Sequence, residues 1–457
     1  MNIGIMGTGY VGLVHGAVLA SYGFNVSCMD VDEHKINQLT AGVPSIYEPD
    51  LEQLIQRGIA GGTLSFTSDA QQVVQSSDVI FIAVGTPSKK DGSADLSYVK
   101  GVVQTISKFV NGYKVIVCKS TLPVGASSRI AEQLNGALQA SGASFRVDVA
   151  SNPEFLRQGQ AVSDAMSPSR IVIGTDSEAA RQMLQTIYAS QIARGVPVLY
   201  TNQETAEMVK YAANSFLAVK ISFINELALL AEKVGAKIDD IAVGMGLDSR
   251  ISPHFLQAGP GYGGSCFPKD TEAVVDIGRR NGEDLFVVQA AIEANKKQKQ
   301  KMVAKISEAL ASYNGTLKGR TIGVWGLSFK PDTDDIRDAP SRDIIQGLID
   351  QGASVRVYCP QGMRQARRMW TELNGAIQYC SSEAECAANA DAIVIMTEWA
   401  QFRTVDWKAI ASSMRCDRAL FDLRNMFAAN ADVQRLFSYY GVGANAEPKV
   451  YSLQEAK

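Results

Sequence analysis

The chain has 457 residues, of which 46% are hydrophobic and 20% are charged, and its formal net charge is −3 at pH 7. This composition is close to the average of globular proteins and excludes a disordered or fibrous chain. The near balance of 44 basic and 47 acidic residues gives no support to nucleic acid or an anionic membrane as the main partner.

The seven cysteines and three histidines favour neither a disulfide scaffold nor a zinc site. The cysteines are odd in number and form no CxxC pair, so we expect reduced thiols and no bound metal. No uninterrupted apolar run approaches the roughly 18 residues that span a bilayer. A strand pattern begins at Asn2, which leaves no room for a signal peptide. We therefore expect a cytoplasmic α/β protein that binds no membrane.

Short β-branched runs alternate with helical patterns through the first two hundred residues. This alternation is typical of βαβ units and a parallel sheet. The expected strands are 2–6, 24–29, 78–84, 114–118, 147–150 and 170–173.

A GxGxxG pattern, formed by Gly7, Gly9 and Gly12, follows the first strand and opens a helix. Its glycines allow a tight turn, close approach of backbone N–H groups to a pyrophosphate, and close packing of helix on strand. Asp30 ends the second strand, where a carboxylate binds the ribose hydroxyls of NAD. Acidic residues at 32 and 33 disfavour a 2′-phosphate, so NAD is favoured over NADP, although Lys35 lies nearby. A purely structural glycine turn is the alternative, and the combination of strand, turn, helix and acid argues against it.

Thr86 and Thr121 belong to loops at the carboxyl ends of later strands. In an open parallel sheet such loops line the ligand crevice. Ordinary loop chemistry is the alternative, and the glycine turn is what favours a binding role.

The segment from 203 to 234 contains no Gly or Pro and predicts one or two long, largely buried helices that end at Gly235. Lys210 and Asn214 are four residues apart in it, so an ammonium and an amide can point at one spot. A lysine in an apolar helix is more often a surface residue whose charge reaches water. A further helix is expected at about 285–310, and we interpret its basic run, 296–301, as a solvated face.

The segment 259–270, GPGYGGSCFPKD, has four glycines among its first six residues. Such a loop destabilises a fold unless its backbone must approach something closely. Cys266 leaves the loop just before Pro268, which suits the first turn of a helix. The helix dipole and Lys269 are expected to lower the pKa of the Cys266 thiol and favour the thiolate. Asp270 is four residues further on and shares the helix face with Cys266.

The alternative for any lone cysteine is a small buried hydrophobic residue. We expect that role for the cysteines on predicted strands, which are Cys28, Cys118 and Cys359.

An NAD site combined with a nucleophilic cysteine indicates an oxidation that passes through an aldehyde. An aldehyde must gain a nucleophile before it can release hydride, and a thiolate gives first a thiohemiacetal, then a thioester, then an acid. This pattern fits aldehyde oxidation as well as alcohol-to-acid oxidation. A two-electron NAD enzyme such as a hydroxyacid dehydrogenase, with a structural Cys266, and a non-catalytic nucleotide-binding protein are the competing hypotheses.

A second α/β unit follows, with strands expected at 321–325, 354–359, 392–396 and 418–422. The segment 323–330, GVWGLSFK, has the same strand followed by a turn as the first unit but lacks the three-glycine spacing. It therefore predicts a second Rossmann-like unit that binds no dinucleotide, in which Lys330 binds a pyrophosphate. The residues after 440 are expected to form a frayed terminus. We therefore predict two Rossmann-like, doubly wound domains, 1–200 and 313–457, joined by a long helical dimerisation region, 201–312.

These motifs together resemble the UDP-glucose/GDP-mannose dehydrogenase family over essentially the full length of the chain. The segments that carry the resemblance, in family order, are GTGYVG, SNPEFLRQG, ETAEMVKYAANSFLA, GMGLDSR, GPGYGGSCFPKD and GLSFKPDTDDIRDAPS. GPGYGGSCFPKD is more similar to the UDP-glucose branch than to the UDP-N-acetylmannosamine or GDP-mannose branches. The resemblance implies two NAD-dependent hydride transfers at carbon 6 of UDP-glucose, giving UDP-glucuronate, by a homodimer built on the central helix.

The resemblance also implies catalytic roles for single residues. Cys266 matches the family nucleophile, and Lys210 and Asn214 match groups that stabilise the developing oxyanion. Lys210 is also a candidate base for the first step. Asp270 matches the acid that supports Lys210 and the water.

Thr121 and Glu154 match a pair that holds water and handles protons. The chain departs from the family pattern at Gln158, where many relatives carry a second acid. Glu154 is therefore the only acid expected to act in this segment.

The remaining implied contacts fall into two sets. The cofactor set is Gly7, Gly9, Tyr10, Val11, Gly12, Asp30, Lys35, Thr86, Thr121, Glu154, Lys269 and Arg337. The substrate set is Glu154, Phe155, Leu156, Lys210, Asn214, Arg250, Phe255, Leu256, Gln257, Tyr262, Gly263, Lys330 and Arg424, with Arg250 reaching the partner subunit's site.

Overall fold

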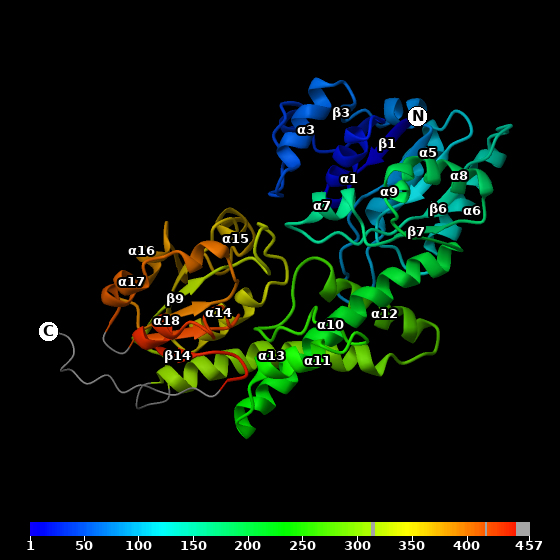
Figure 1. Cartoon of the computed structure of the whole chain (residues 1–457). Coiled ribbons are helices and arrows are strands. Elements are labelled where there is room, and N and C mark those ends of the chain that lie inside the picture. The colour runs from blue at the N-terminus through cyan, green and yellow to red at the C-terminus, as the bar shows by residue number, and fades with distance from the viewer. Residues whose placement is uncertain (312–315, 416–417, 445–457) are drawn as a thin grey trace, which may run out of the picture. The chain divides into compact units, whose positions relative to one another are not determined.

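The structure, a computed structural model, describes residues 1–311, 316–415 and 418–444. It divides into two compact units, one of Met1–Ala213 with Glu272–Asp284 and one of Asn214–Thr271 with Leu285–Lys457. Each unit contains one β-sheet with helices around it, as Figure 1 shows, which confirms the predicted α/β class with two Rossmann-like sheets. The predicted domain boundary at 312 and 313 lies outside the described residues.

The first unit contains an eight-stranded sheet in the order β3-β2-β1-β4-β5-β6-β7-β8. All neighbouring strands are parallel except β6 and β7, which are antiparallel and meet only at Ser151 and Gly174. The sheet is thus mixed rather than wholly parallel. The strands are β1 (Asn2–Met6), β2 (Asn25–Met29), β3 (Leu64–Thr67), β4 (Val79–Ile82), β5 (Val115–Cys118), β6 (Asp148–Ser151), β7 (Ile171–Gly174) and β8 (Val198–Thr201).

Helices cover both faces of this first sheet. Successive strand residues point to opposite faces, so Val79 and Phe81 of β4 join one buried cluster while Ile80 and Ile82 join another. Both faces are apolar, which is why the central strands read as continuous hydrophobic runs. The helices are α1 (Tyr10–Ser21), α2 (Glu33–Thr40), α3 (Leu51–Ala60), α4 (Ala70–Ser76), α5 (Ser97–Phe109), α6 (Ala126–Ala140), α7 (Ala161–Met166), α8 (Glu178–Ile187) and α9 (Ala189–Ala193).

The second unit contains a six-stranded parallel sheet in the order β11-β10-β9-β12-β13-β14. This order matches that of β3-β2-β1-β4-β5-β6 in the first sheet, so both sheets are wound in the Rossmann manner. The strands are β9 (Thr321–Trp325), β10 (Ser354–Tyr358), β11 (Ile377–Tyr379), β12 (Ala392–Ile395), β13 (Ala419–Asp422) and β14 (Ser438–Tyr440). The helices are α11 (Ile238–Gly246), α13 (Phe286–Leu310), α14 (Pro340–Asp350), α15 (Met363–Met369), α16 (Glu383–Ala387), α17 (Trp407–Ser413) and α18 (Ala431–Leu436), with the 3₁₀ turn η1 (Ala400–Arg403).

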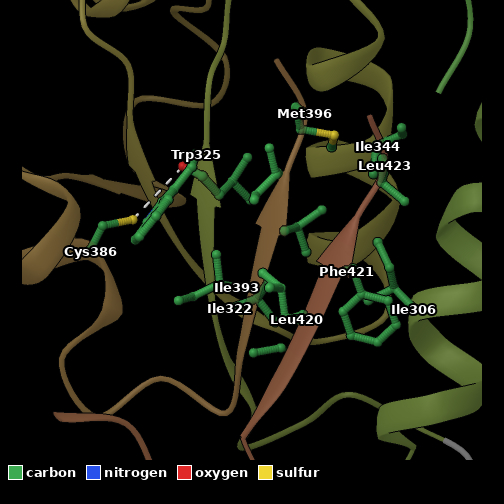
Figure 2. Close-up of a cluster of buried hydrophobic side chains, with 14 of the residues drawn as sticks. Ile306, Ile322, Trp325, Ile344, Cys386, Ile393, Met396, Leu420, Phe421 and Leu423 are labelled. Carbon is green, nitrogen blue, oxygen red and sulfur yellow. Dashed lines mark hydrogen bonds between the residues drawn. The ribbon is translucent and has the colours of Figure 1, made fainter. Parts of the chain in front are cut away.

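The core of the second unit lies between this sheet and its helices. Figure 2 shows Phe421 of β13 with Ile306 of α13, and Leu423 with Ile344 of α14, all within one buried cluster. Cys386 of α16 donates its thiol hydrogen to a backbone carbonyl of β9, at an Sγ–O distance of 3.8 Å.

The central segment forms one unbroken helix, α10 (Gln203–Val234), with the bounds that the sequence predicts. By length and composition alone it is long and apolar enough to cross a membrane, although charged residues such as Lys220 and Glu226 interrupt its apolar sequence. Core helices of soluble proteins pass the same test, so it is weak evidence. The helix α12 (Phe267–Arg280) follows the glycine-rich loop.

The expectation of a frayed terminus after residue 440 is wrong for residues 441–443, which are buried. The N–H of Val442 donates to Asn425 Oδ1 at 2.8 Å, and the N–H of Gly443 donates to Glu232 Oε1 at 2.8 Å. Val442 belongs to the hydrophobic core, which is what holds this segment. Asn445 and Cys416 lie outside the described residues, and the six described cysteines are free thiols.

Candidate active site

The dinucleotide turn is built as the sequence predicts. A Cβ at Gly12 would lie 2.0 Å from the carbonyl oxygen of Gly7, so no side chain fits there. A Cβ at Gly9 would meet nothing within 4 Å, so the backbone is open on the side where a pyrophosphate would lie. The tight turn at Gly12 and the open backbone at Gly9 therefore fit the binding of the NAD pyrophosphate.

Asp30 lies at the end of β2 and faces this turn. Its Oδ2 accepts hydrogen bonds from the N–H of Thr8 at 2.9 Å and from Thr8 Oγ1 at 2.7 Å, and pairs with Lys35 Nζ at 2.8 Å. Partial burial raises the pKa of Asp30, but the bonds from Lys35 and Thr8 outweigh it and hold the pKa at about 2. A permanently charged acceptor therefore stands where ribose hydroxyls bind.

The loops that follow β4 and β5 are tied together. Thr86 Oγ1 donates to the carbonyl of Thr121 at 3.0 Å, and Ser120 Oγ donates to the carbonyl of Val84 at 2.6 Å. The two threonines predicted to contact the cofactor thus lie side by side at the carboxyl edge of the first sheet.

Lys210 is buried, which excludes the surface alternative. Its Nζ lies 2.9 Å from Glu154 Oε1 and 2.8 Å from the carbonyl of Glu154. Burial raises the pKa of Glu154, but Lys210 and the N–H of Leu156, at 2.5 Å, outweigh it and lower the pKa. The pair is therefore a buried ammonium and carboxylate.

A second buried lysine, Lys119, was missed by the sequence analysis. Its Nζ donates to Asn152 Oδ1 at 2.9 Å and to Tyr188 Oη at 3.2 Å. Burial lowers the pKa of Lys119 to about 8, although Glu154 opposes the shift. Its position in the sequence could have indicated its burial, since Lys119 directly follows the buried strand β5.

Two buried glutamates, Glu48 and Glu207, were also missed. Glu207 accepts from the N–H groups of Gly125 at 2.6 Å and Ser127 at 2.8 Å, at the start of α6. Glu48 accepts from the N–H of Gly159 at 2.7 Å, next to Gln158, which is itself buried. Both acids hold backbone at the carboxyl edge of the first sheet.

Cys266 lies immediately before α12, as predicted. The N–H of Asp270 donates to the carbonyl of Cys266 at 2.9 Å and closes the first helical turn. Asp270 is buried, accepts a hydrogen bond from Asn214 Nδ2 at 2.6 Å, and pairs with Lys269. Cys266, Asn214 and Asp270 thus all belong to the second unit.

The glycine-rich loop does approach other backbone closely, as its composition predicts. A Cβ at Gly263 would lie 2.2 Å from the carbonyl oxygen of Asp338, and one at Gly264 would lie 2.8 Å from the ring of Phe329. The N–H of Gly264 also donates to the carbonyl of Arg337 at 2.9 Å. The loop that carries Cys266 is therefore pressed against the segment that follows β9.

Helix α13 holds the same loop from its buried side. Asn295 Oδ1 accepts from the N–H of Tyr262 at 2.8 Å, and Gln298 Nε2 donates to the carbonyl of Gly259 at 2.7 Å. The interpretation of 296–301 as a solvated face is therefore wrong for Gln298, which is buried. Neither amide was predicted, because their partners are backbone atoms far away in sequence.

The predicted substrate residues Lys330 and Arg424 follow β9 and β13. Arg424 Nη2 donates to the carbonyl of Phe329 at 3.0 Å, and its Nε lies 3.1 Å from Glu398 Oε2. These contacts tie the two loops together at the carboxyl edge of the second sheet.

The other predicted substrate and cofactor residues of the second unit differ in exposure. Leu256 and Tyr262 are buried, whereas Gln257 is exposed. Arg250 is exposed and pairs with Asp248 at 2.5 Å, and Arg337 pairs with Asp335 at 2.6 Å.

The predicted site residues fall into two groups, one in each unit. The first unit brings together the glycine turn, Asp30, Lys35, Thr86, Thr121, Glu154 and Lys210. The second contains Asn214, Cys266, Asp270, Lys330, Arg337 and Arg424. Helix α10 carries both Lys210 and Asn214 without a break.

Comparison with known proteins gives the family. Three sequence models of the UDP-glucose/GDP-mannose dehydrogenase family match: the NAD binding domain at residues 1–192, the central domain at 204–297 and the UDP binding domain at 323–429. A UDP-glucose 6-dehydrogenase of Rhizobium meliloti is 43% identical over 97% of this chain and 99% of its own length. One of Bacillus subtilis is 42% identical over 97% of this chain and 94% of its own.

Solved structures agree. A UDP-glucose dehydrogenase from the archaeon Pyrobaculum islandicum has a TM-score of 0.87 and 36% identity, covering 97% of this chain and 98% of its own. A UDP-D-ManNAc dehydrogenase from Pyrococcus horikoshii has a TM-score of 0.83 and 27% identity, covering 97% and 99%. The chain therefore belongs to the UDP-glucose/GDP-mannose dehydrogenase family, and its N-terminal sheet is the NAD-binding part of an oxidoreductase.

Proposed function

We propose that the chain oxidises UDP-glucose to UDP-glucuronate in two NAD-dependent steps at carbon 6, through a covalent intermediate on Cys266. The observation that carries the proposal is the placement of Cys266, a half-buried thiol at the first turn of α12 in a loop pressed against the second sheet. A simple alcohol dehydrogenase needs no such nucleophile. The named activity of relatives at 43% and 42% identity supports the same substrate.

In the first step the hydroxyl at carbon 6 loses its proton and an aldehyde forms. NAD, when bound, accepts a hydride in each of the two oxidations. Lys210, held by Glu154, and the amide of Asn214 donate hydrogen bonds to the developing alkoxide. Lys210 is a candidate for the base that receives the proton only as the neutral amine, after its ammonium has passed a proton to Glu154.

In the second step the Cys266 thiolate attacks the aldehyde carbon, and the carbonyl oxygen becomes the oxyanion of a thiohemiacetal. Lys210 and Asn214 stabilise this oxyanion as well. Loss of the second hydride leaves a thioester on Cys266.

Hydrolysis then frees the product. Water, held by Thr121 and Glu154 with support from Asp270, adds to the thioester carbonyl, the carbon–sulfur bond breaks, and Cys266 leaves as a thiolate. Overall the sugar gains one oxygen atom from water and loses four electrons as two hydrides. Lys330, Arg424 and the loop from Phe255 to Gly263 bind the UDP-sugar.

The direct test replaces the nucleophile. Cys266→Ser should abolish formation of UDP-glucuronate while NAD and UDP-glucose still bind, as measured by calorimetry. Cys386→Ser, the same substitution at a buried thiol of the second unit's core, is the matched control and should keep the activity. Acid formation by Cys266→Ser would remove the nucleophile from the proposal.

Glu154→Gln separates the steps. Because Glu154 is assigned to the water, this change should slow thioester hydrolysis more than the first oxidation, measured by single-turnover kinetics. Equal slowing of both steps would count against the assignment.

The second candidate is the same mechanism on another nucleotide sugar, such as a UDP-N-acetylhexosamine or GDP-mannose. The observation that favours it is the close structural match to a UDP-D-ManNAc dehydrogenase. Turnover on UDP-N-acetylmannosamine in place of UDP-glucose would select it.

We also propose a homodimer built on α10. Three large apolar residues are spaced seven apart on this helix and are exposed: Phe216 at 65%, Phe223 at 48% and Leu230 at 53%. A row of exposed large apolar residues on one helix is typical of an interface, and Arg250 would contribute to the partner's site. Phe223→Asp should convert the dimer to a monomer by light scattering, whereas Tyr98→Asp, at an exposed aromatic of α5, should not.

A further inference from the structure

The two sheets allow a position-by-position comparison at the end of their second strands. The N–H of Gly7 after β1 donates to the carbonyl of Met29, and the N–H of Gly326 after β9 donates to the carbonyl of Tyr358, both at 2.8 Å. Cys359 of the second sheet therefore occupies the place that Asp30 occupies in the first.

A cavity of about 720 Å³ opens at this place. Its lining includes Cys359 and the ring-bearing Tyr358 at the end of β10, and Ser381 after β11. The volume is in the range of sites that hold small molecules. In a doubly wound sheet the carboxyl ends of the strands are where ligands bind.

Three arginines of α15, Arg364, Arg367 and Arg368, line the same cavity. All three are exposed, and the cavity lining contains no carboxylate. Arg367 is fixed over the ring of Tyr379 at 4.7 Å. The contrast with the first sheet is clear, because Lys35 there is paired with Asp30.

We propose that this cavity binds a small anion that bears at least two phosphate groups, with Arg364, Arg367 and Arg368 as the phosphate ligands. Guanidinium groups match phosphate oxygens in geometry as well as in charge. In dinucleotide-binding sheets an arginine near this strand end accommodates a ribose phosphate, whereas an acid binds the free hydroxyls. In the second sheet Cys359 replaces the acid and three arginines are added. The site is therefore suited to phosphate groups rather than to free ribose hydroxyls.

This site differs from that of the UDP-sugar. Lys330 and Arg424 follow β9 and β13, and neither lines the cavity. The strand order places β10 and β11 on one side of β9, and β12 and β13 on the other. Both ligands can therefore be bound at once.

The test is calorimetric titration of the full chain with adenosine 2′,5′-bisphosphate, and in a separate arm with inorganic pyrophosphate. Saturating NAD and UDP are present throughout, so that the two expected nucleotide sites are filled. The proposal predicts saturable binding that weakens at least tenfold in Arg364→Ala/Arg368→Ala. The matched control Lys408→Ala/Arg435→Ala removes the same charge from α17 and α18 and should bind as the wild type does.

The two arms distinguish the sources of the phosphate groups. Tighter binding of the bisphosphate supports a nucleotide ligand, and equal or tighter binding of pyrophosphate supports a free polyphosphate anion. Absence of saturable binding in both arms would overturn the proposal. So would unchanged affinity in the cavity variant, or equal weakening in the control, which would show only a general effect of charge.

Discussion

The two Rossmann-like sheets share a strand order and the same hydrogen bond after their first strands, yet their loops have opposite chemistry. The first sheet presents an open glycine turn and an ionised Asp30. The second presents Lys330, Arg424 and the arginines of α15 at the corresponding edge. Strand order therefore fixes where a ligand can bind, and a few residues at strand ends decide its charge and class.

The largest expected effect is at the glycine turn, which only the first sheet has in full. Gly12→Ala should lower the melting temperature and abolish NAD binding, since its Cβ would lie 2.0 Å from backbone. Gly9→Ala should fold normally, because its Cβ meets nothing, and still lose at least about tenfold in NAD affinity. Calorimetry and thermal melts measure both effects. Gly136→Ala on α6, also in open space, is the control, and tight NAD binding by Gly9→Ala would contradict the account.

The next largest effect distinguishes the residue at the end of β2 from the residue at the end of β10. Asp30→Ala should weaken NAD binding about tenfold, the loss expected for a charged hydrogen bond, and leave UDP binding unchanged. Cys359→Ala, at the equivalent position of the second sheet, should leave NAD binding unchanged. Titrations with NAD and with UDP measure both variants. A similar loss of NAD affinity in the two variants would break the comparison.

Lys330→Ala tests the second sheet in the same way. Loss of an ammonium from a pyrophosphate should raise KM for UDP-glucose by about tenfold with little change in the KM for NAD. Lys318→Ala, an exposed lysine before β9, is the control. An unchanged KM for UDP-glucose in Lys330→Ala would remove this lysine from the proposed site.

The smallest effect is the pH dependence of Asp30. Its pKa of about 2 lies below the unfolded value of 3.8, so it stabilises the fold above pH 4 and loses that contribution as the pH falls toward 2. The melting-temperature difference between wild type and Asp30→Asn should be constant from pH 8 to pH 5 and shrink below pH 4. A difference that changes between pH 8 and pH 5 would contradict a depressed pKa.

Much of this architecture could be predicted, because its signals are local in sequence. The bounds of the helix Gln203–Val234 were predicted, since Gly235 ends it and no breaker interrupts it, whereas the choice between one helix and two was left open. The expectation that this segment is largely buried is wrong, because large apolar side chains such as Phe216 and Leu230 are exposed. The strands at the centres of both sheets were found because they are continuous apolar runs. The glycine-rich loop before Cys266 predicted a close approach to other parts of the chain. The structure shows this approach, to the ring of Phe329 and to the backbone of Asp338.

The parts that were missed lack such local signals. Strands β3, β8, β11 and β14 have three or four residues and are partly exposed, so no hydrophobic pattern marks them. Gln298 and Lys119 are buried because of partners distant in sequence, and composition alone places both in water. The burial of Val442 likewise depends on Asn425 and on the packed core.

The most direct test of the central claim is the yield of NADH from limiting UDP-glucose with excess NAD. UDP-galactose, UDP-N-acetylglucosamine and GDP-mannose are run beside it. The central claim is that one sheet binds NAD, the other binds the UDP-sugar, and the reaction passes through a thioester on Cys266. It predicts two NADH and one carboxylate product per UDP-glucose. One NADH per sugar, with an aldehyde or ketone as product, would contradict it.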